Sequence, residues 1–474
     1  MSDKPLVVDA DGTLLRTDML LECAWKGLGT DPQGTLRAIR HLPDRAAFKA
    51  ALARIAPLRI DLLPVHEEIV ALVEQAKAQG REVVLASASD RSLVDPLAQR
   101  FGFDRVFASD GGKNLKGAAK ARALVDAYGE QGFDYAGNDA SDMEIWRHAD
   151  RAIVVGRVGG AVHKLDDPVR IAGGWSPRAL IKALRPHQWV KNVLLFLPMI
   201  AAHAFHFDTF LRVCLGIVAF SAAASTIYIV NDLLDIEADR LHATKKRRPF
   251  AAGTVPIPVG MAACLLLAIV ALGVGAALSW QMFGVVAFYM ALSLAYSMRL
   301  KRLRWIDIAT LASLYTLRVV AGAAASEVYA SVFMLIFIFP IFLTLGCVKR
   351  MTELALAPDD KPLPGRGYAR GDRGDLLNMA VLGMVGALVI FFLYSWSDQA
   401  RILYPDQWLL WVALLPIAAW LYRMIRLGYF GKQDYDPIVF ALRDIRGIGY
   451  LLITLSLMFY AAGLWTEWYF RLVG

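Results

Sequence analysis

The chain has 474 residues, a formal net charge of +8 and a hydrophobic content of 57%. Its mean hydropathy of +0.43 is too apolar for an ordinary soluble enzyme. Charge and polarity up to about residue 185 are typical of a soluble α/β domain, whereas long uncharged stretches dominate the rest. We therefore predict a multidomain fold, in which an α/β domain is followed by an all-α polytopic membrane bundle.

The cysteines and the N-terminus indicate the compartment of the first domain. The four cysteines form no CxxC pair, so disulfides and a zinc site are not expected, and a reducing compartment fits. The N-terminal sequence MSDKPLVVDADGT contains no long apolar segment typical of a signal peptide. We therefore expect the first domain to remain in the cytoplasm.

A short apolar strand and an acidic turn begin the α/β domain. Residues 5–8 form an apolar run typical of a buried parallel strand, and the sequence DADGT follows at once. A carboxylate at the C-terminal end of a strand lies where α/β folds place their chemistry. Because Gly12 permits a turn, Asp9 can act as a nucleophile and Asp11 can protonate a leaving group.

Two further strands are predicted to end in polar side chains. REVVLA, residues 81–86, is followed by Ser87, and FDYAG, residues 133–137, is followed by Asn138 and Asp142. Polar side chains therefore follow these two predicted strands, in the same way that Asp9 and Asp11 follow the first strand.

These motifs resemble those of the haloacid dehalogenase (HAD) phosphohydrolase superfamily over about residues 5–160. The resemblance implies a Rossmann-like domain, residues 1–170, with a helical cap formed by about residues 17–80. It implies that Asp9 attacks phosphorus to form an aspartyl phosphate. Asp11 would be the general acid and base, and its backbone carbonyl would help to bind one magnesium ion together with Asp9.

The remaining motifs imply how the phosphoryl group and the metal are held. Ser87 would hydrogen-bond the phosphoryl group, and Lys120, or less readily Lys116, would neutralise it. The last motif departs from the usual GDxxxD, because Asn138 stands at the metal-ligand position and Asp142, a predicted substrate-binding residue, at the second-acid position. An amide oxygen coordinates magnesium with less charge, so either the adjacent acid compensates or metal binding is weaker. We favour an active phosphatase over an inactive scaffold, because both acids of DADGT are intact.

We predict nine membrane-spanning helices after a linker at residues 171–188, at about 20 residues per span. The segment from Val255 to Met298 contains no charged side chain and would hold two spans back to back. The predicted spans, in a membrane domain of residues 189–474, are 189–206, 212–231, 257–279, 282–298, 308–325, 330–348, 376–396, 408–422 and 448–466.

The basic residues favour one orientation of these spans. The loops after the even-numbered spans are rich in Lys and Arg, and the opposite loops are short and poor in them. The positive-inside rule then predicts a multi-pass protein of the inner (plasma) membrane, with the N-terminal domain in the cytoplasm and the C-terminus outside. Because topology explains the excess basic charge, no nucleic-acid partner is expected. The sequence leaves open whether the protein is a homo-oligomer.

Polar side chains recur every fourth residue where the second predicted span ends. Asn231, Asp235 and Asp239 would line one face of a helix, with Asp232 beside them. Grouped carboxylates at the end of a membrane helix repel each other, and Mg²⁺, which binds carboxylates together with phosphate oxygens, is the natural counter-ion. The basic run 245–248 follows, as an anionic substrate requires. A solvated helix end before a positive-inside loop would explain these basic residues but not the acids in four-residue register.

The run NDLLDIEAD resembles the first motif, NDxxDxxxD, of the UbiA-type membrane prenyltransferase superfamily, and the resemblance extends over about residues 180–470. It implies a helical bundle with its site at the cytoplasmic end of a lipid-facing cavity. Most members use an isoprenyl diphosphate, whereas one branch transfers phosphoribose from phosphoribosyl pyrophosphate (PRPP) to a polyprenyl phosphate. Runs that begin at Arg185, Asp239, Tyr296 and Lys349 resemble that branch.

The resemblance implies that one or two magnesium ions bind the diphosphate, held by Asn231, Asp232, Asp235 and Asp239, with Asp235 and Asp239 catalytic. Polar and basic residues would hold the phosphate groups, although about half of the basic ones are expected only to anchor loops at the lipid headgroups. These residues are Arg185, Lys191, Asn192, Arg240, Lys246, Arg248, Tyr296, Lys301, Arg318, Lys349, Arg350 and Glu353.

Three of these residues have structural alternatives. Arg318 lies within the fifth predicted span, where it needs a partner or water, and a structural ion pair is the alternative to a functional role. Tyr296 fits an interfacial aromatic belt as well as a catalytic role. Glu353 fits a residue that only orients its basic neighbours.

We therefore predict that the membrane domain makes polyprenyl-phosphoryl 5-phosphoribose from PRPP and that the HAD-like domain removes the 5-phosphate. The first product carries a phosphomonoester, and tethering the domains raises the effective concentration at the second site. The alternative is a prenyltransferase that acts on an aromatic or lipid acceptor, with a regulatory or inactive HAD-like domain. A transporter is a third reading, although no internal repeat is visible.

Overall fold

The computed structural model describes residues 3–110, 112, 114–159, 165, 167–357, 362–363, 366–433 and 436–467. Its contacts divide the chain into two compact units, which are described separately. The first unit comprises Met1–Leu184 and Tyr228–Leu265, and the second comprises Arg185–Ile227 and Leu266–Gly474. This division groups Tyr228–Leu265 with the α/β domain, whereas the sequence had suggested a membrane domain that runs unbroken from residue 189.

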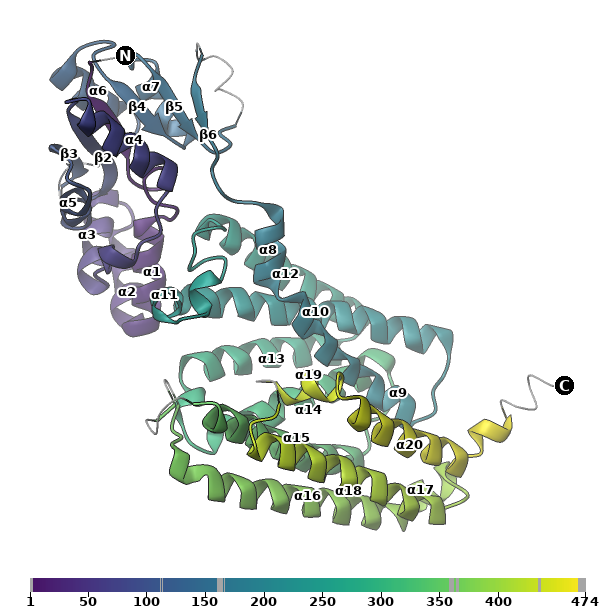
Figure 1. Cartoon of the computed structure of the whole chain (residues 1–474). Coiled ribbons are helices and arrows are strands. Elements are labelled where there is room, and N and C mark those ends of the chain that lie inside the picture. Colours follow the sequence, from purple (N-terminus) through teal and green to yellow (C-terminus); the bar gives the residue numbers. More distant parts are fainter. Residues whose placement is uncertain are drawn as a thin grey trace. The chain divides into compact units, whose positions relative to one another are not determined.

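A parallel sheet of six strands forms the centre of the first unit, in the order β3-β2-β1-β4-β5-β6 (Figure 1). The strands predicted near residues 5–8, 81–86 and 133–137 are confirmed as β1, β2 and β4. The strands are β1 (Leu6–Asp9), β2 (Val83–Asp90), β3 (Arg105–Ser109), β4 (Asp134–Gly137), β5 (Ala152–Val155) and β6 (Val169–Ile171).

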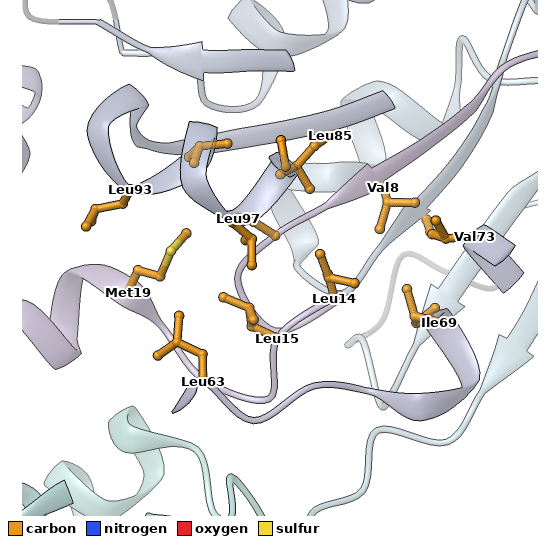
Figure 2. Packing of buried hydrophobic residues seen from close by; sticks show 14 of the residues in the cluster. Val8, Leu14, Leu15, Met19, Leu63, Ile69, Val73, Leu85, Leu93 and Leu97 are labelled. Atoms are coloured by element: carbon orange, nitrogen blue, oxygen red, sulfur yellow. The ribbon is translucent and has the colours of Figure 1, made fainter. Parts of the chain in front are cut away.

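The strands build two hydrophobic cores, because successive side chains point to opposite faces of a sheet. Leu6 and Val8 belong to one core and Val7 to the other, and all three are fully buried. Figure 2 shows the first core, in which Met19 and Ile69 from the helices pack with the strand residues. The helices of this unit are α1 (Met19–Thr30), α2 (Pro32–Ala38), α3 (Arg45–Ile55), α4 (Glu67–Ala78), α5 (Arg91–Phe101), α6 (Ala118–Tyr128), α7 (Met143–Trp146) and α8 (Pro177–Leu184).

The region predicted as a cap, residues 17–80, is helical and holds α1 to α4. Its buried side chains belong to the same core as the strands. That this region acts as a cap stays a prediction. The first unit also holds the C-terminal end of α10 (Phe207–Leu234), all of α11 (Ile236–Leu241) and the beginning of α12 (Ile257–Leu278).

The second unit is a bundle of helices. Besides most of α10 and the rest of α12, it contains a 3₁₀-helix (Pro186–Phe196), α9 (Leu197–Ala201), α13 (Trp280–Met298), α14 (Ile306–Ser326), α15 (Val332–Ala355), α16 (Arg373–Ser395), α17 (Asp398–Leu403), α18 (Trp408–Tyr429), α19 (Pro437–Ala441) and α20 (Ile445–Ala461). Among the residues that the structure describes, seven helices are long and apolar enough to cross a membrane: α10, the five from α12 to α16, and α18. The protein is therefore an integral membrane protein.

The structure does not confirm nine spans. In place of the first predicted span, residues 189–206, a 3₁₀-helix is followed by the short helix α9. A continuous α-helix is disfavoured there because Pro198 has no N–H to donate to the preceding turn. The last predicted span, 448–466, corresponds to the apolar helix α20, which has only 17 residues. The orientation stays a prediction, and residues 468–474, which were predicted to lie outside, are not among those described.

Candidate active sites

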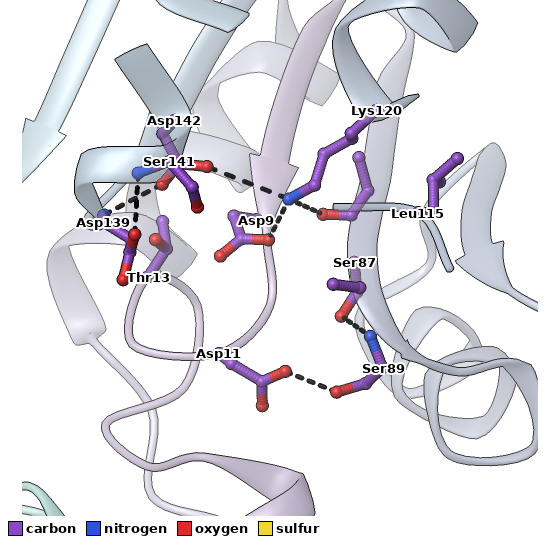
Figure 3. Close-up of polar contacts among 12 residues, drawn as sticks. Asp9, Asp11, Thr13, Ser87, Ser89, Leu115, Lys120, Asp139, Ser141 and Asp142 are labelled. Atoms are coloured by element: carbon purple, nitrogen blue, oxygen red, sulfur yellow. Dashed lines mark hydrogen bonds and ion pairs between the residues drawn. The ribbon is translucent and has the colours of Figure 1, made fainter. Parts of the chain in front are cut away.

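The acidic turn after β1 lines a cavity in the first unit, and we call this part of the lining its floor. Figure 3 shows the polar contacts around the turn. Asp9 is the last residue of β1, and Asp11 follows in the turn. Gly12 has a φ of +78°, and a Cβ added there would lie 2.1 Å from Nδ2 of Asn138. Glycine is therefore required at this position, because it supplies the backbone angle and lets the two loops approach each other.

Lys120 is the cation that neutralises this floor. Its Nζ lies 2.6 Å from Oδ1 of Asp9 and 4.0 Å from Oδ1 of Asp142, and the side chain is only 4% exposed. Burial lowers the pKa of Lys120, but the adjacent carboxylates outweigh burial and raise that pKa above its ordinary value. Lys116, the less favoured candidate, lines the same cavity but is exposed.

The two acids of the turn differ in protonation. Burial raises the pKa of Asp9 to about 6, although Lys120 opposes the rise. Burial, together with the charge of Asp18, raises the pKa of Asp11 to about 7. The pKa of Asp11 is thus raised further than that of Asp9, which favours a proton on Asp11 and a charge on Asp9. A nucleophile and a general acid need this division of roles.

The loop after β4 is organised by Asp142. Its Oδ2 accepts hydrogen bonds from the backbone N–H groups of Asn138 (3.0 Å) and Asp139 (2.9 Å), and its Oδ1 accepts one from the hydroxyl of Tyr135 (3.0 Å). Thr13 donates to Oδ1 of Asn138 at 3.0 Å. Asp142, predicted as a substrate ligand, is thus 3% exposed and holds the loop in shape.

A second serine, which was not predicted, contacts an acid of the turn directly. Ser87 is fully buried and accepts a hydrogen bond from the backbone N–H of Ser89 (3.0 Å). Ser89 lines the cavity, and its hydroxyl donates to Oδ2 of Asp11 at 2.6 Å. Ser89 was not predicted from the sequence. The feature that could have indicated it is the second serine of the run SAS, residues 87–89.

The cavity extends well beyond the catalytic acids. Its volume is about 940 Å³. The lining includes the cations Arg16, Arg45, Lys49, Lys116, Lys120 and Arg157, and also Trp175, Gly253, Pro256, Ile257 and Pro258. The last four belong to the segment that contains the beginning of α12, so two parts of the chain that are distant in sequence share this cavity.

The acidic motif after α10 is not on one unbroken helix. α10 ends at Leu234, and Asp235 caps the separate short helix α11 with φ −102° and ψ 12°. The four-residue register survives nonetheless, because the N–H of Asp235 donates to the carbonyl of Asn231 (3.0 Å) and that of Asp239 to the carbonyl of Asp235 (2.8 Å). The prediction of a single helix face is therefore wrong at Asp235, where the helix is interrupted.

Arg248 neutralises two acids of this motif. Its Nη1 lies 3.2 Å from Oδ1 of Asp232 and 2.7 Å from Oδ2 of Asp239. Arg240 is engaged differently, since its two terminal nitrogens donate to both carboxylate oxygens of Glu22 in α1 at 2.8 Å and 2.6 Å. Two residues predicted to bind phosphate thus have carboxylate partners, whereas Lys246 is exposed.

The donors of the motif suit a hard cation. Within the described residues, no group of three or more His, Cys, Asp or Glu side chains could hold a metal ion. The buried Oδ1 of Asn231, however, has no hydrogen-bond partner among these residues. Mg²⁺ binds one or two carboxylates and completes its shell with other oxygens, so an amide oxygen beside carboxylates fits it without a cluster of three acids.

Arg350 lies in a buried polar cluster of the second unit. Its guanidinium donates to both carboxylate oxygens of Asp307, to Glu353 and, at 3.0 Å, to the hydroxyl of Tyr296. Arg366 adds hydrogen bonds of 2.9 Å to Asp307 and 3.0 Å to Tyr296. Three residues predicted to hold phosphate, Tyr296, Arg350 and Glu353, therefore interact within this cluster. Asp307 and Arg366 were not predicted from the sequence, because they belong to no recognisable motif.

Arg318, inside α14, has aromatic surroundings. Its guanidinium carbon lies 5.4 Å, 5.2 Å and 5.4 Å from the ring centres of Phe220, Tyr289 and Tyr315. Its Nε donates to Oδ1 of Asn192 at 3.2 Å, and a carbonyl of its own helix accepts another hydrogen bond. Aromatic faces and an amide therefore surround a cation for which the sequence suggested a substrate or an ion pair.

The remaining basic candidates lie in different environments. Lys191 is buried and forms an ion pair with Asp436, which the sequence analysis missed. The side chain of Lys349, in α15, forms no hydrogen bond or ion pair with any residue that the structure describes. Arg185 is partly buried with a φ of +54°, and Lys301 is partly buried in the turn after α13.

An α/β domain with an acid pair at a strand end, joined to a bundle of apolar helices, defines a membrane enzyme with a hydrolase-like domain. The model of the UbiA prenyltransferase family matches residues 193–442, and that of the haloacid dehalogenase-like hydrolases matches residues 6–146. The chain therefore belongs to the UbiA prenyltransferase family and carries a HAD-like domain, as the sequence motifs had suggested.

Three relatives cover different shares of the chain. Uncharacterized protein y4nM of Sinorhizobium fredii is 36% identical over 456 residues, which are 93% of this chain and 87% of that protein. Nodulation protein NoeC of Azorhizobium caulinodans is 31% identical over 267 residues, 56% of this chain and 86% of that protein. The decaprenyl-phosphate phosphoribosyltransferase of Corynebacterium glutamicum is 40% identical over 202 residues, 41% of this chain and 58% of that enzyme.

Proposed function

We propose that the membrane bundle transfers 5-phosphoribose from PRPP to a polyprenyl phosphate and that the HAD-like domain then hydrolyses the 5-phosphate. The products are polyprenyl-phosphoryl ribose and inorganic phosphate. One observation carries the proposal: a chain similar to decaprenyl-phosphate phosphoribosyltransferases also holds Asp9, Asp11 and Lys120 at the floor of a cavity. The first reaction makes a phosphomonoester, and those side chains suit its hydrolysis.

In the transfer reaction, the chain has to orient two phosphorylated substrates and exclude water. When bound, Mg²⁺ would be held by Asn231 with Asp235 and Asp239, and it would stabilise the departing diphosphate. The phosphate oxygen of the lipid is already anionic, so it needs positioning beside the ribosyl carbon and no strong base. The Lys349 ammonium suits this task, because its side chain makes no hydrogen bond with the described residues, although Asp436 and Glu353 act on it electrostatically. Departure of the diphosphate gives the ribosyl carbon oxocarbenium character.

In the hydrolysis, Asp9 attacks phosphorus while Asp11 gives its proton to the sugar oxygen that leaves. The aspartyl phosphate is then cleaved by water, from which Asp11 takes a proton. Lys120 neutralises the phosphoryl oxygens from within the floor, and Ser89 orients Asp11. A Mg²⁺ ion would be held by Asp9, the carbonyl of Asp11 and Asn138, and it would offset the charge on phosphate.

The test is to supply PRPP, Mg²⁺ and a polyprenyl phosphate to the purified full-length protein and to measure inorganic phosphate and the lipid products. The Asp9→Asn variant should accumulate the phosphorylated lipid and release little phosphate. Asp126→Asn, which changes an exposed acid of α6, is the control and should behave as the parent does. Phosphate release by Asp9→Asn at the parental rate would refute the role of the HAD-like domain.

A second candidate follows from the family itself, whose name describes prenyl transfer. In that case the electrophile would be an isoprenyl diphosphate, the acceptor an aromatic ring or a lipid, and the HAD-like domain would be regulatory or inactive. Radiolabelled PRPP and radiolabelled isoprenyl diphosphate, each offered to membranes that contain the protein, separate the two candidates by which label enters the lipid fraction.

A further inference from the structure

The cavity above Asp9 is larger than a phosphoryl group requires. Its volume of about 940 Å³ lies near the upper end of the roughly 300–1,000 Å³ that ligand pockets usually occupy. Lys120 is the cation in contact with Asp9, where the reacting phosphate would bind. The other cations of the lining, among them Arg16 and Arg157, are therefore available to a second part of the substrate.

Arg16 is held in place by its backbone and by two glycines. Its N–H donates to the carbonyl of Pro64 at 2.9 Å. A Cβ on Gly253, whose φ is +64°, would lie 2.5 Å from the Cβ of Arg16, and a Cβ on Gly174 would lie 3.6 Å from its Cζ. The backbone of Arg16 is thus anchored, and the two glycines leave room beside its side chain, which lines the cavity.

One nitrogen of the Arg16 side chain has no acceptor among the described residues. That nitrogen is Nε, which is buried. Buried polar groups are nearly always satisfied, and leaving one unsatisfied costs about 1–3 kcal/mol or more when it is charged. An anion in the cavity would provide that acceptor, and phosphate oxygens match the fork of an arginine.

The cavity wall is apolar, and not basic, where it meets α12. Pro256, Ile257 and Pro258 line the cavity, and Ile257 is the first residue of α12. That helix has 22 residues and the highest mean hydropathy of the seven candidate spans, 2.6. The apolar part of the cavity wall thus continues along the chain into a helix that is long and apolar enough to cross a membrane, which suits a substrate that carries a lipid tail.

We propose that Arg16 forms a second anion subsite, which binds the phosphodiester between sugar and lipid while Asp9 attacks the terminal phosphate of the same molecule. The HAD-like site then selects lipid-linked sugar phosphates over soluble phosphomonoesters. This inference rests on the proposed phosphatase function and names the group by which that site recognises its substrate.

The experiment compares three phosphomonoesters as substrates of the full-length protein in lipid nanodiscs. They are ribose 5-phosphate, its 1-(methylphosphoryl) derivative and its 1-(farnesylphosphoryl) derivative. The first lacks the diester, the second adds it without a tail, and the third has both. The kcat/KM for phosphate release should rise at the second compound and rise again at the third.

Arg16→Ala should lower kcat/KM for both diester compounds by about 10–100-fold, the worth of a hydrogen bond to a charged group. Its effect on ribose 5-phosphate should be much smaller, so the preference for diesters collapses. Arg16→Lys keeps a point charge, so its kcat/KM for the diester compounds should lie between those of the parent and of Arg16→Ala. Arg54→Ala, which changes an exposed arginine outside the cavity, is the matched control and should keep the parental preference.

Each outcome separates the inference from the proposed function. Equal kcat/KM for all three compounds in the parent, or an equal loss in Arg16→Ala for all three, overturns the anion subsite and leaves the phosphatase intact. Release of phosphate from none of them, with Asp9→Asn unchanged, overturns the phosphatase function itself. Because the preference of the parent is measured without any variant, misfolding of Arg16→Ala cannot hide the answer.

Discussion

Acidic side chains gather at two places in the first unit, and they are neutralised in different ways. At the end of β1, Asp9 has Lys120 at 2.6 Å, and that lysine is only 4% exposed. In the motif after α10, Arg248 bridges two acids from a basic run and is 29% exposed. The first counter-ion is buried, whereas the second is partly exposed to solvent.

The difference bears on what each place can bind. A buried lysine at fixed distance presents one preformed position to a phosphoryl group, because nothing must move when the substrate arrives. Around the second motif, a cation that binds the same carboxylates has to compete with Arg248 for them. We therefore expect the floor of the α/β cavity to be rigid and the acidic motif to respond to metal concentration.

The largest expected effect is that the acids at the end of β1 and the acidic motif after α10 support two different reactions. Asp9→Ala removes the nucleophile and should lower phosphate release by about 10⁴-fold or more. Asp235→Ala should abolish transfer from PRPP yet leave hydrolysis of a supplied phosphorylated lipid unchanged. Measuring both reactions in both variants checks the division, and loss of both activities in either variant would contradict it.

The next effect concerns stability and the ion pair that joins α1 to α11. The Glu22 and Arg240 side chains are 3% and 6% exposed, so Glu22→Ala leaves a buried arginine unpaired and should cost about 3–5 kcal/mol. The matched control is Lys26→Ala, whose partner Glu237 lies on the same two helices. That pair is 24% and 30% exposed, so its loss should cost less than about 1 kcal/mol.

Chemical denaturation in detergent, followed by tryptophan fluorescence, measures both losses. The double variant Glu22→Ala/Arg240→Ala should regain part of the stability, because it removes the unpaired charge as well. Equal losses for Glu22→Ala and Lys26→Ala would show that burial of the first pair contributes nothing.

A smaller effect is expected in the pH profile of phosphate release. Asp9 must be ionised, so kcat/KM should rise as pH increases through its pKa of about 6. Asp11 must carry a proton, so kcat/KM should fall as pH increases through its pKa of about 7, giving a narrow optimum between the two values. Asp11→Asn, which has no proton to lose, should lack the alkaline limb. A profile that is flat across this interval would contradict the assignment.

The smallest effect is expected from a change of Arg248, the partly exposed counter-ion. Arg248→Gln removes the residue that competes for Asp232 and Asp239, and it should lower the Mg²⁺ concentration for half-maximal binding several-fold. Isothermal titration with Mg²⁺ alone measures the change, and Lys246→Gln, an exposed neighbour, is the control. Weaker Mg²⁺ binding in Arg248→Gln would mean that the arginine does not compete with the metal.

The sequence predicted what depends on local order and missed what depends on distant contacts. The strand ends were predictable because apolar runs stop at polar residues, and Asp9, Asp11 and Lys120 do share one site. Ser89 was not predicted, because the resemblance to the HAD superfamily assigns the serine position of that motif to Ser87. Arg16 follows the acidic turn closely, but only the folded chain shows that its Nε lacks a partner.

The helical bundle shows the same limit. Seven long apolar helices were predictable from composition, whereas the 3₁₀-helix at Pro186–Phe196 follows from backbone geometry that hydropathy does not report. Arg350 stood out as a phosphate ligand because its local run was basic. Its partner Asp307 lies 43 residues away, and such pairing cannot be deduced from either segment alone.

The wall that α12 contributes has a consequence for how the protein is made. A ribosome finishes the α/β domain well before it reaches Pro256, so the newly folded domain lacks one side of its chamber until the hydrophobic helix emerges. Hydrolysis of lipid-linked substrates would then begin only after insertion into the bilayer. A fragment cut after residue 184 would keep Arg16 but lack this apolar wall, so it should keep the preference for a diester and lose the preference for a lipid tail.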